Sequence, residues 1–210
     1  MNNFRERIII LILAIFPSMI LYSQTSKEEL KINFERSLKE KGNKINTIKC
    51  KFEQERKMSV LSRSVYNKGV FYYSRPENIL LSFDGGDYIK MSDKMFQMKN
   101  METVVKTRIS SNPMLRELNK LLSSCMTGDI LNPTTGFSMN LLLEGKEYIL
   151  ELVPTNKRAA SKVSLIEIRF DTSDMSLTNL KMIEVSGDYT SYRFYDKEFN
   201  IPLGEEIFTF

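Results

Sequence analysis

The sequence predicts a mainly β domain with a few helices, an α+β fold built on one antiparallel sheet. From Thr47 onward, apolar and polar residues alternate with the period of two that is typical of half-buried strands. Turn-forming clusters at 84–87, 144–146 and 186–188 separate these runs and indicate β-hairpins. About nine to eleven short strands fit this spacing, and they predict a single meander that is closed or nearly closed on itself.

The first 23 residues have the order of a secretory signal peptide. Two arginines form a basic start, an apolar run extends over residues 8–15, and Pro17 interrupts the apolar stretch. This stretch is shorter than the roughly 20 residues that a membrane-spanning helix needs, so we expect cleavage after Ser23 rather than a membrane anchor. No cysteine lies near this junction to carry a lipid. Residues 24–210 are therefore expected to form one soluble, exported domain.

The exported part opens with one amphipathic helix. Ser26 and Glu29 can form a capping box at its start, in which each side chain binds the other residue's free backbone N–H group. Apolar residues then recur every four positions, at Leu30, Phe34 and Leu38. Gly42 stands where a helix C-terminal cap is expected. Because a helix with one apolar stripe must bury it, we expect this helix to pack against the sheet.

The alternation also shows which residues share a strand face. In the opening strand, apolar residues alternate with charged ones at Ile48, Cys50 and Phe52. A later strand carries four apolar residues on one face, at Phe137, Met139, Leu141 and Leu143. The same pattern returns near the end of the chain, at Ile166, Ile168 and Phe170 and then at Tyr192 and Phe194. The alternation thus places the apolar residues of each strand on one common face.

One segment departs from the β pattern. Asn112 can cap a helix whose first residue is Pro113, a position where proline is tolerated. Leucines follow at helical spacing before Gly128 ends the unit, at Leu115, Leu118, Leu121 and Leu122. This helix is either a movable cover for the sheet or a permanent part of the core, because its apolar stripe fits both roles.

The composition removes most catalytic machinery. The chain has no histidine, which excludes most catalytic triads, most catalytic zinc sites and the commonest general base. The nearest candidate for catalysis, the pair Asp84 and Asp87, is better explained as a turn, because aspartate binds its own backbone there. We expect no enzyme, no cofactor and no metal site. The net charge of +4 forms no basic stripe, so no nucleic acid is expected as a partner.

Cysteine and methionine leave two questions open. An exported protein can form a disulfide between Cys50 and Cys125, but no framework of other cysteines supports it, so two buried free thiols are favoured. Methionines gather in the middle of the chain, at Met91, Met95, Met98, Met101, Met114 and Met126. Such flexible side chains suit an apolar surface for ligands of varied shape, or they fill gaps in an ordinary core.

Several segments occur in one order that resembles a known family. They are Phe52-Glu53-Gln54, the run 69–76 with an aromatic pair before Arg-Pro, the strand 166–171, the turn 187–190 and the closing Phe208-Thr209-Phe210. Together with the signal peptide and the length, this ordered set is similar to the outer-membrane lipoprotein carrier family (LolA-like). The similarity extends over nearly all of the exported part.

This resemblance implies an incomplete, strongly curved antiparallel β-barrel whose mouth is covered by lid helices. It also implies a periplasmic carrier that shields lipoprotein acyl chains and transports lipoproteins from the inner to the outer membrane. The partners of such a carrier are acylated lipoproteins, an inner-membrane ABC transporter, and an outer-membrane acceptor or the membrane itself, and the carrier acts as a monomer. The alternative is a lipid- or lipoprotein-binding or sensing module of the same fold without a transport role.

The resemblance also assigns residues. Arg75 matches the family's arginine, which bonds backbone groups of the lid and holds the ligand-free form shut, and Ile79 falls where the family places a bulky apolar residue important to the handover. Apolar residues of the strands and the inserted helix are candidates for the acyl-chain cavity: Phe71, Tyr73, Ile79, Leu80, Phe83, Met91, Met95, Met98, Leu115, Leu118 and Leu122. The alternation alone does not tell which strand face is concave.

Overall fold

The computed structural model describes residues 27–111, 113–128 and 136–210. The expected signal peptide and the expected helix caps at Ser26 and Asn112 lie outside these residues. Within the described ranges, no helix is both long enough and apolar enough to cross a membrane.

About half of the described chain forms one eleven-stranded sheet in which every neighbouring pair is antiparallel. The strands are β1 (Thr47–Lys57), β2 (Val65–Ser74), β3 (Asn78–Phe83), β4 (Tyr88–Met91), β5 (Met95–Asn100), β6 (Thr103–Arg108), β7 (Phe137–Glu144), β8 (Glu147–Pro154), β9 (Val163–Asp171), β10 (Leu177–Glu184) and β11 (Tyr189–Phe199). The predicted hairpin turns are confirmed, with left-handed glycines at Gly86, Gly145 and Gly187.

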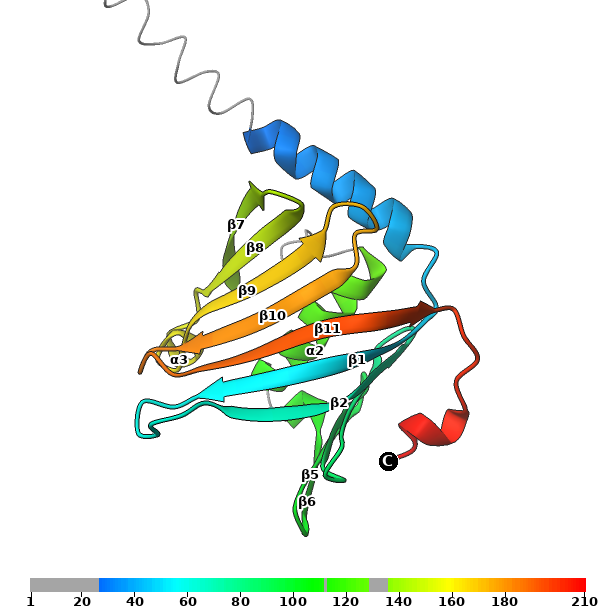
Figure 1. Cartoon of the computed structure of the whole chain (residues 1–210), viewed down its shortest axis with the longest axis vertical. Helices are drawn as coiled ribbons and strands as arrows, with labels where there is room; N and C mark the ends of the chain where they lie inside the picture. Colours follow the sequence, from blue (N-terminus) through cyan, green and yellow to red (C-terminus); the bar gives the residue numbers. More distant parts are fainter. Residues whose placement is uncertain (1–26, 112, 129–135) are drawn as a thin grey trace, which may run out of the picture.

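The sheet joins its first and last strands and opens in the middle of the chain. Its strand order is β6-β5-β4-β3-β2-β1-β11-β10-β9-β8-β7, so β6 and β7 are the two free edges. The connection between these edges contains η1 (Ile109–Ser111) and α2 (Pro113–Thr127) in place of a β6–β7 pairing. Figure 1 shows the resulting curved sheet with α2 lying across it. The prediction of an incomplete antiparallel barrel with helices is therefore confirmed.

Two further short helices complete the described structure, α3 (Lys157–Ala160) and η2 (Glu205–Phe208). The first helix covers residues 27–42. Its apolar stripe is buried as predicted, because Phe34 and Leu38 are 0% and 1% exposed. The ring of Phe34 lies 5.0 Å from that of Tyr148 and 5.4 Å from that of Phe170, which fixes the helix on β8 and β9.

Gly42 ends the first helix, but it does not act as the left-handed cap that its position predicts. It is absent from the glycines with positive φ in the described chain. A Cβ at Gly42 would stand 2.5 Å from the carbonyl carbon of Thr127, and one at Gly128 would stand 2.6 Å from the carbonyl oxygen of Leu38. Glycine is therefore needed at both positions because the ends of the first helix and α2 touch through their backbones.

The strand register defines two faces of the sheet. The inner face, which is turned toward the first helix and α2, carries one apolar row across five strands: Cys50, Phe71, Leu81, Ile89 and Met98. The outer face is charged, and there Glu53 pairs with Lys68 at 3.0 Å and with Arg193 at 2.6 Å. Apolar residues inside and charged residues outside is the pattern expected of a sheet with one solvated face.

Candidate functional site

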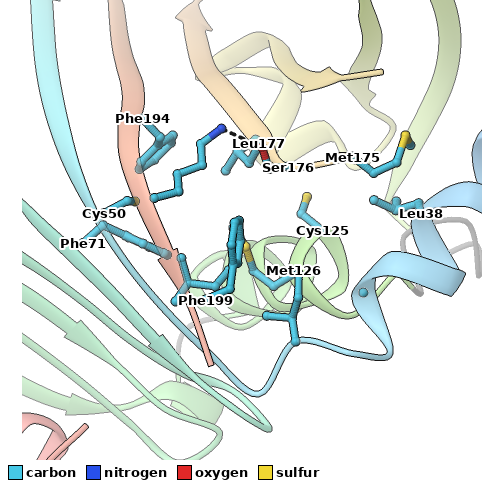
Figure 2. A pocket seen from close by; sticks show the side chains of 14 residues that line it. Leu38, Cys50, Phe71, Cys125, Met126, Met175, Ser176, Leu177, Phe194 and Phe199 are labelled. Carbon is cyan, nitrogen blue, oxygen red and sulfur yellow. Dashed lines mark hydrogen bonds between the residues drawn. The ribbon is translucent and has the colours of Figure 1, made fainter. Parts of the chain in front are cut away.

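A cavity lies on the inner face where the first helix, α2 and strands β1, β2, β10 and β11 meet (Figure 2). Its wall is mainly apolar and includes Cys50, Phe71, Cys125, Met126, Leu177 and Phe194. The cavity has a volume of only about 20 Å³, which is room for one or two water molecules. An acyl chain does not fit in this arrangement, so binding one requires that a wall moves.

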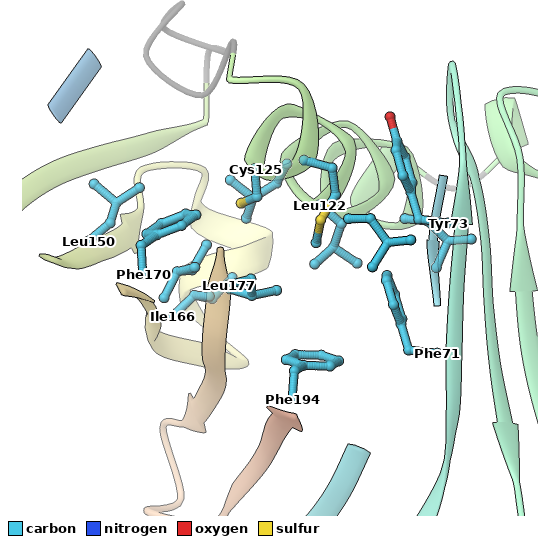
Figure 3. Close-up of a cluster of buried hydrophobic side chains, with 14 of the residues drawn as sticks. Phe71, Tyr73, Leu122, Cys125, Leu150, Ile166, Phe170, Leu177 and Phe194 are labelled. Atoms are coloured by element: carbon cyan, nitrogen blue, oxygen red, sulfur yellow. The ribbon is translucent and has the colours of Figure 1, made fainter. Parts of the chain in front are cut away.

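The element that fills the interior is α2. Four of its side chains, Leu121, Leu122, Cys125 and Met126, are buried in the hydrophobic cluster of the sheet. Figure 3 shows Leu122 and Cys125 between Phe71 and Tyr73 on one side and Leu150 and Phe170 on the other. α2 thus occupies the space between the two arms of the sheet, where acyl chains would have to lie.

The buried side of α2 also carries two polar residues. Asn119 is 1% exposed, and its amide donates to the Ser92 carbonyl oxygen at 3.0 Å. Its Oδ1 atom and the buried Oγ atom of Ser123 have no hydrogen-bond partner among the described residues. A buried polar atom without a partner costs about 1–3 kcal/mol, so these two atoms weaken the packing of α2 against the sheet.

Both cysteines are buried and free, so the favoured prediction is confirmed and the disulfide is not formed. Cys50 belongs to β1 and Cys125 to α2, so the two thiols stand on opposite sides of the contact between helix and sheet. Burial raises the pKa of the Cys50 thiol to about 12, and burial also raises the pKa of the Cys125 thiol. Both side chains are therefore neutral and unreactive at pH 7 while α2 is in place.

Arg75 binds the end of the first helix. Its Nη2 donates to the Gly42 carbonyl oxygen at 2.6 Å and its Nε to the Ile45 carbonyl oxygen at 2.5 Å. Its backbone N–H also donates to the Asn46 carbonyl oxygen, at 2.9 Å. These acceptors belong to the turn that follows the first helix, where carbonyl groups lack helical partners. Among the described contacts, Arg75 reaches α2 through Gly42, which touches the end of that helix.

Six of the residues predicted for the cavity project from the inner strand faces: Phe71, Tyr73, Ile79, Phe83, Met91 and Met98. Leu80 and Met95 project from the outer face instead, because Leu80 pairs with Tyr72 and Lys90, and Met95 with Arg108. Leu80 is nevertheless buried, since η2 packs against β3 there. Leu122 is buried against the sheet, and Leu115 and Leu118 belong to α2 but their side chains lie outside the described part.

Of the fourteen residues that line the cavity, only Phe71 was predicted as a cavity residue; the residues missed include Met175, Ser176 and Lys197. Lys197 was detectable in principle. Tyr192 and Phe194 keep a period of two, but Phe199 at the end of β11 lies an odd number of positions after Phe194. Such a change of phase within one strand indicates a β-bulge, which turns the following side chains to the other face.

Few groups in the described part are suited to chemistry on a substrate. No cluster of three or more histidine, cysteine, aspartate or glutamate side chains arranged to hold a metal ion occurs in the described ranges. Several carboxylates of the outer face are held by cations, as Glu167 is by Arg169 at 2.7 Å. What the described site offers is mainly apolar surface.

The comparisons with known proteins agree with this architecture. A sequence comparison with curated proteins finds no match. Among solved structures, a proposed outer membrane lipoprotein-sorting protein domain from Vibrio parahaemolyticus is 14% identical in sequence, with a TM-score of 0.47. The match covers 88% of this chain and 96% of that chain.

Two other solved structures match at a similar distance. An uncharacterized conserved protein from Thermus thermophilus is 9% identical, with a TM-score of 0.49, covering 88% of this chain and 94% of that chain. The Mycobacterium tuberculosis lipoprotein LppX is 9% identical, with a TM-score of 0.40 over 82% of this chain and 96% of that chain. We draw no functional argument from likenesses this distant.

The family comparison is decisive because it covers most of the chain. The model of the family described as outer membrane lipoprotein carrier protein LolA matches residues 43–210, which include every strand of the sheet and α2. The chain therefore belongs to the LolA family of outer membrane lipoprotein carrier proteins.

Proposed function

We propose that this protein is a periplasmic carrier that shields the acyl chains of lipoproteins during transport from the inner to the outer membrane. In this proposal, residues 1–23 are a signal peptide that is removed, and residues 24–210 act as one monomeric carrier domain. An inner-membrane ABC transporter loads it with acylated lipoprotein, and an outer-membrane acceptor or the membrane receives the cargo. No catalytic step is involved.

The observation that carries the proposal is the way α2 fills an apolar interior. Its leucine, cysteine and methionine side chains occupy the space between the arms of the sheet, while two of its buried polar atoms lack described partners. Apolar contacts of this kind can be exchanged for contacts with acyl chains at little net change in free energy. α2 is therefore suited to be a lid that closes over the empty interior and leaves when cargo enters.

The energetics explain why such a carrier is needed. Each methylene group transferred from water to an apolar site gains about 0.8 kcal/mol. Two or three long acyl chains contain about forty methylene groups, so their passage through water would cost on the order of 30 kcal/mol. The cargo must also be released, and a lid that closes on the empty interior competes with the chains and limits their affinity.

Arg75 supports this cycle from the side of the first helix. It fixes the turn after residue 42, and that turn is the place where the end of α2 rests. The planar guanidinium holds two carbonyl groups at once, which a lysine cannot do with equal geometry. We propose that Arg75 stabilises the closed lid by holding in place the turn against which the end of α2 packs.

Native mass spectrometry of the protein isolated from its own periplasm tests the function. Co-purified acylated lipoprotein is the expected result. Free phospholipid or another apolar molecule in its place would support the binding or sensing module without transport. An empty protein that also fails to take acylated lipoprotein from inner-membrane vesicles supplied with the transporter and ATP would contradict the carrier function.

The same vesicle assay tests Arg75 with a matched pair of variants. Arg75→Leu removes both side-chain hydrogen bonds to the turn, so we expect the closed lid to lose stability and the release of bound lipoprotein to slow about tenfold. Arg75→Lys keeps the charge and one bond, and it should give an intermediate rate. Release at the normal rate from Arg75→Leu would remove Arg75 from the mechanism.

A further inference from the structure

A β-bulge turns one lysine into the apolar interior. The β1–β11 ladder shifts register around Cys50, so that Asp196 and Lys197 together face this single residue of β1. Asp196 has φ of 52° and directs its carboxylate outward to the Lys51 ammonium at 2.9 Å. The extra residue reverses the alternation that follows Phe194, and Lys197 therefore projects from the inner face into the cavity.

The ammonium of Lys197 has one described partner, a neutral one. Its Nζ atom donates to the Oγ atom of Ser176 at 2.7 Å, although an ammonium has three protons to donate. In the described part of the chain no carboxylate lies within ion-pair distance of Lys197. Burial in the apolar surroundings lowers the pKa of Lys197, and the more distant carboxylates of Asp174, Asp171 and Glu147 raise it.

Each of these three carboxylates is already engaged elsewhere. The Asp171 carboxylate accepts from the backbone N–H and the hydroxyl group of Ser173, at 2.7 and 2.6 Å. The Asp174 carboxylate accepts from the backbone N–H of Ser176 at 2.8 Å. Glu147 accepts from Arg169 and Thr178. These carboxylates lie close enough to attract the ammonium, but they do not satisfy its remaining protons.

A half-buried ammonium beside an apolar cavity is costly unless it gains further acceptors. The nearby carboxylates would repel a charged carboxylate ligand, so a neutral carbonyl oxygen is the favoured acceptor, and Lys197 can bind it with a charge-assisted hydrogen bond. Ser176 accepts from Lys197, and its own hydroxyl proton can be donated to the same ligand. Acyl chains joined to glycerol or to an amine carry such a carbonyl at the end of an apolar tail.

We propose that Lys197 and Ser176 form a polar anchor that binds the ester or amide carbonyl oxygens at the head of an acyl chain in the opened cavity. This inference rests on the proposed function, because the cavity must open before the tail can enter. The tail then replaces the side chains of α2 along the inner face, while the anchor fixes the depth and direction of the chain. The anchor thus selects acyl esters and amides over other apolar molecules.

A pair of lipids that differ in one carbonyl tests the anchor. Palmitoyl glycerol ester and hexadecyl glycerol ether have tails of equal length, and only the ester carries the carbonyl. We expect wild-type protein to bind the ester about tenfold more tightly in isothermal titration or by displacement of a fluorescent fatty probe. Lys197→Met keeps the apolar stem and should lose this preference while binding the ether as well as wild type does.

Lys162→Met is the matched control, because Lys162 is exposed and lies away from the cavity wall. It should keep the full preference for the ester. Equal affinity of wild type for ester and ether would overturn the anchor and leave the carrier function intact. Palmitate bound more tightly than the ester, with that advantage lost in Lys197→Met, would overturn the choice of a neutral carbonyl. Failure of wild type to bind either glycerol lipid would count against the proposed function itself.

Discussion

The first helix and α2 both pack on the inner face, but they are held in different ways. The first helix buries two apolar side chains, those of Phe34 and Leu38, and the Phe34 ring contacts two aromatic rings of the sheet. Its end is tied by two hydrogen bonds from Arg75. In the proposed cycle it therefore serves as the fixed wall of the cavity.

In the proposed cycle, α2 is the helix that moves. It buries leucine, cysteine and methionine side chains together with Asn119 and Ser123, each of which leaves one polar atom without a described partner. The end of α2 meets the end of the first helix through backbone at Gly42 and Gly128. We infer from this comparison that a helix acting as a lid needs enough apolar surface to bind the sheet when closed. It also needs enough buried polar atoms without partners to keep that binding weak.

The largest effect that separates the two helices should come from Phe34→Ala. Removing a fully buried ring leaves a cavity, and the free energy of unfolding should fall by about 3–5 kcal/mol. Ile32→Ala on the same helix is the control, because Ile32 is 51% exposed, and its effect should stay within about 0.5 kcal/mol. Urea denaturation measures both variants. A small effect of Phe34→Ala would mean that the first helix is also movable, and the distinction between wall and lid would fail.

Alkaline pH should weaken the contact between α2 and the sheet. The folded-state pKa of Cys50 is raised to about 12 by burial, from an ordinary value of 9.0. The unfolded chain therefore loses this proton at a lower pH than the folded one, so the stabilisation is complete below pH 9 and decreases as the pH rises toward 12. Between these values the free energy of unfolding should fall by about 1.4 kcal/mol per pH unit for this thiol.

Burial raises the pKa of the Cys125 thiol as well, so it should add a slope of the same sign. Urea denaturation at pH 8, 9 and 10 measures the combined slope. Cys125→Ala should be less stable at pH 8 because a buried side chain becomes smaller, yet its stability should fall less steeply with pH. A slope that is unchanged in both Cys50→Ala and Cys125→Ala would show that these thiols are not kept from water by α2.

The local features of both regions could be predicted from sequence. The start of β1 at Thr47, the glycine turns and the span of α2 up to Thr127 all follow from residues that are neighbours in the chain. The apolar stripe of the first helix was predictable for the same reason, because helical periodicity is local. What failed was the explanation of Gly42, since the close approach of a second helix is not encoded near it.

The faces of the strands could be predicted only where the alternation is clean. Ile79, Leu80 and Leu81 are three apolar residues in a row, and pairing places the middle one on the outer face, where η2 covers it. The inward turn of Lys197 depends on a bulge in the pairing of β1 with β11, strands that lie far apart in the chain. Both outcomes are decided by non-local pairing, which a single sequence specifies weakly.

The smallest and most specific effect should come from Ser123→Ala in α2. This change removes a buried hydroxyl group without a described partner, so the closed form should gain about 1 kcal/mol, opposite in sign to the first two effects. Ser124→Ala is the control for the better helix propensity of alanine, because Ser124 is only half-buried. Any stabilisation beyond that of the control belongs to the buried hydroxyl.

Thiol labelling of Cys125 measures how often α2 leaves the sheet, and so detects the same change in stability. The thiol reacts only when α2 leaves the sheet, so a gain of about 1 kcal/mol in the closed form should slow labelling by roughly fivefold. Uptake of acylated cargo should slow in parallel, since the lid must open before the chains enter. Faster labelling of Ser123→Ala would show that the hydroxyl stabilises the packing of α2. The weak hold on this helix would then need another cause.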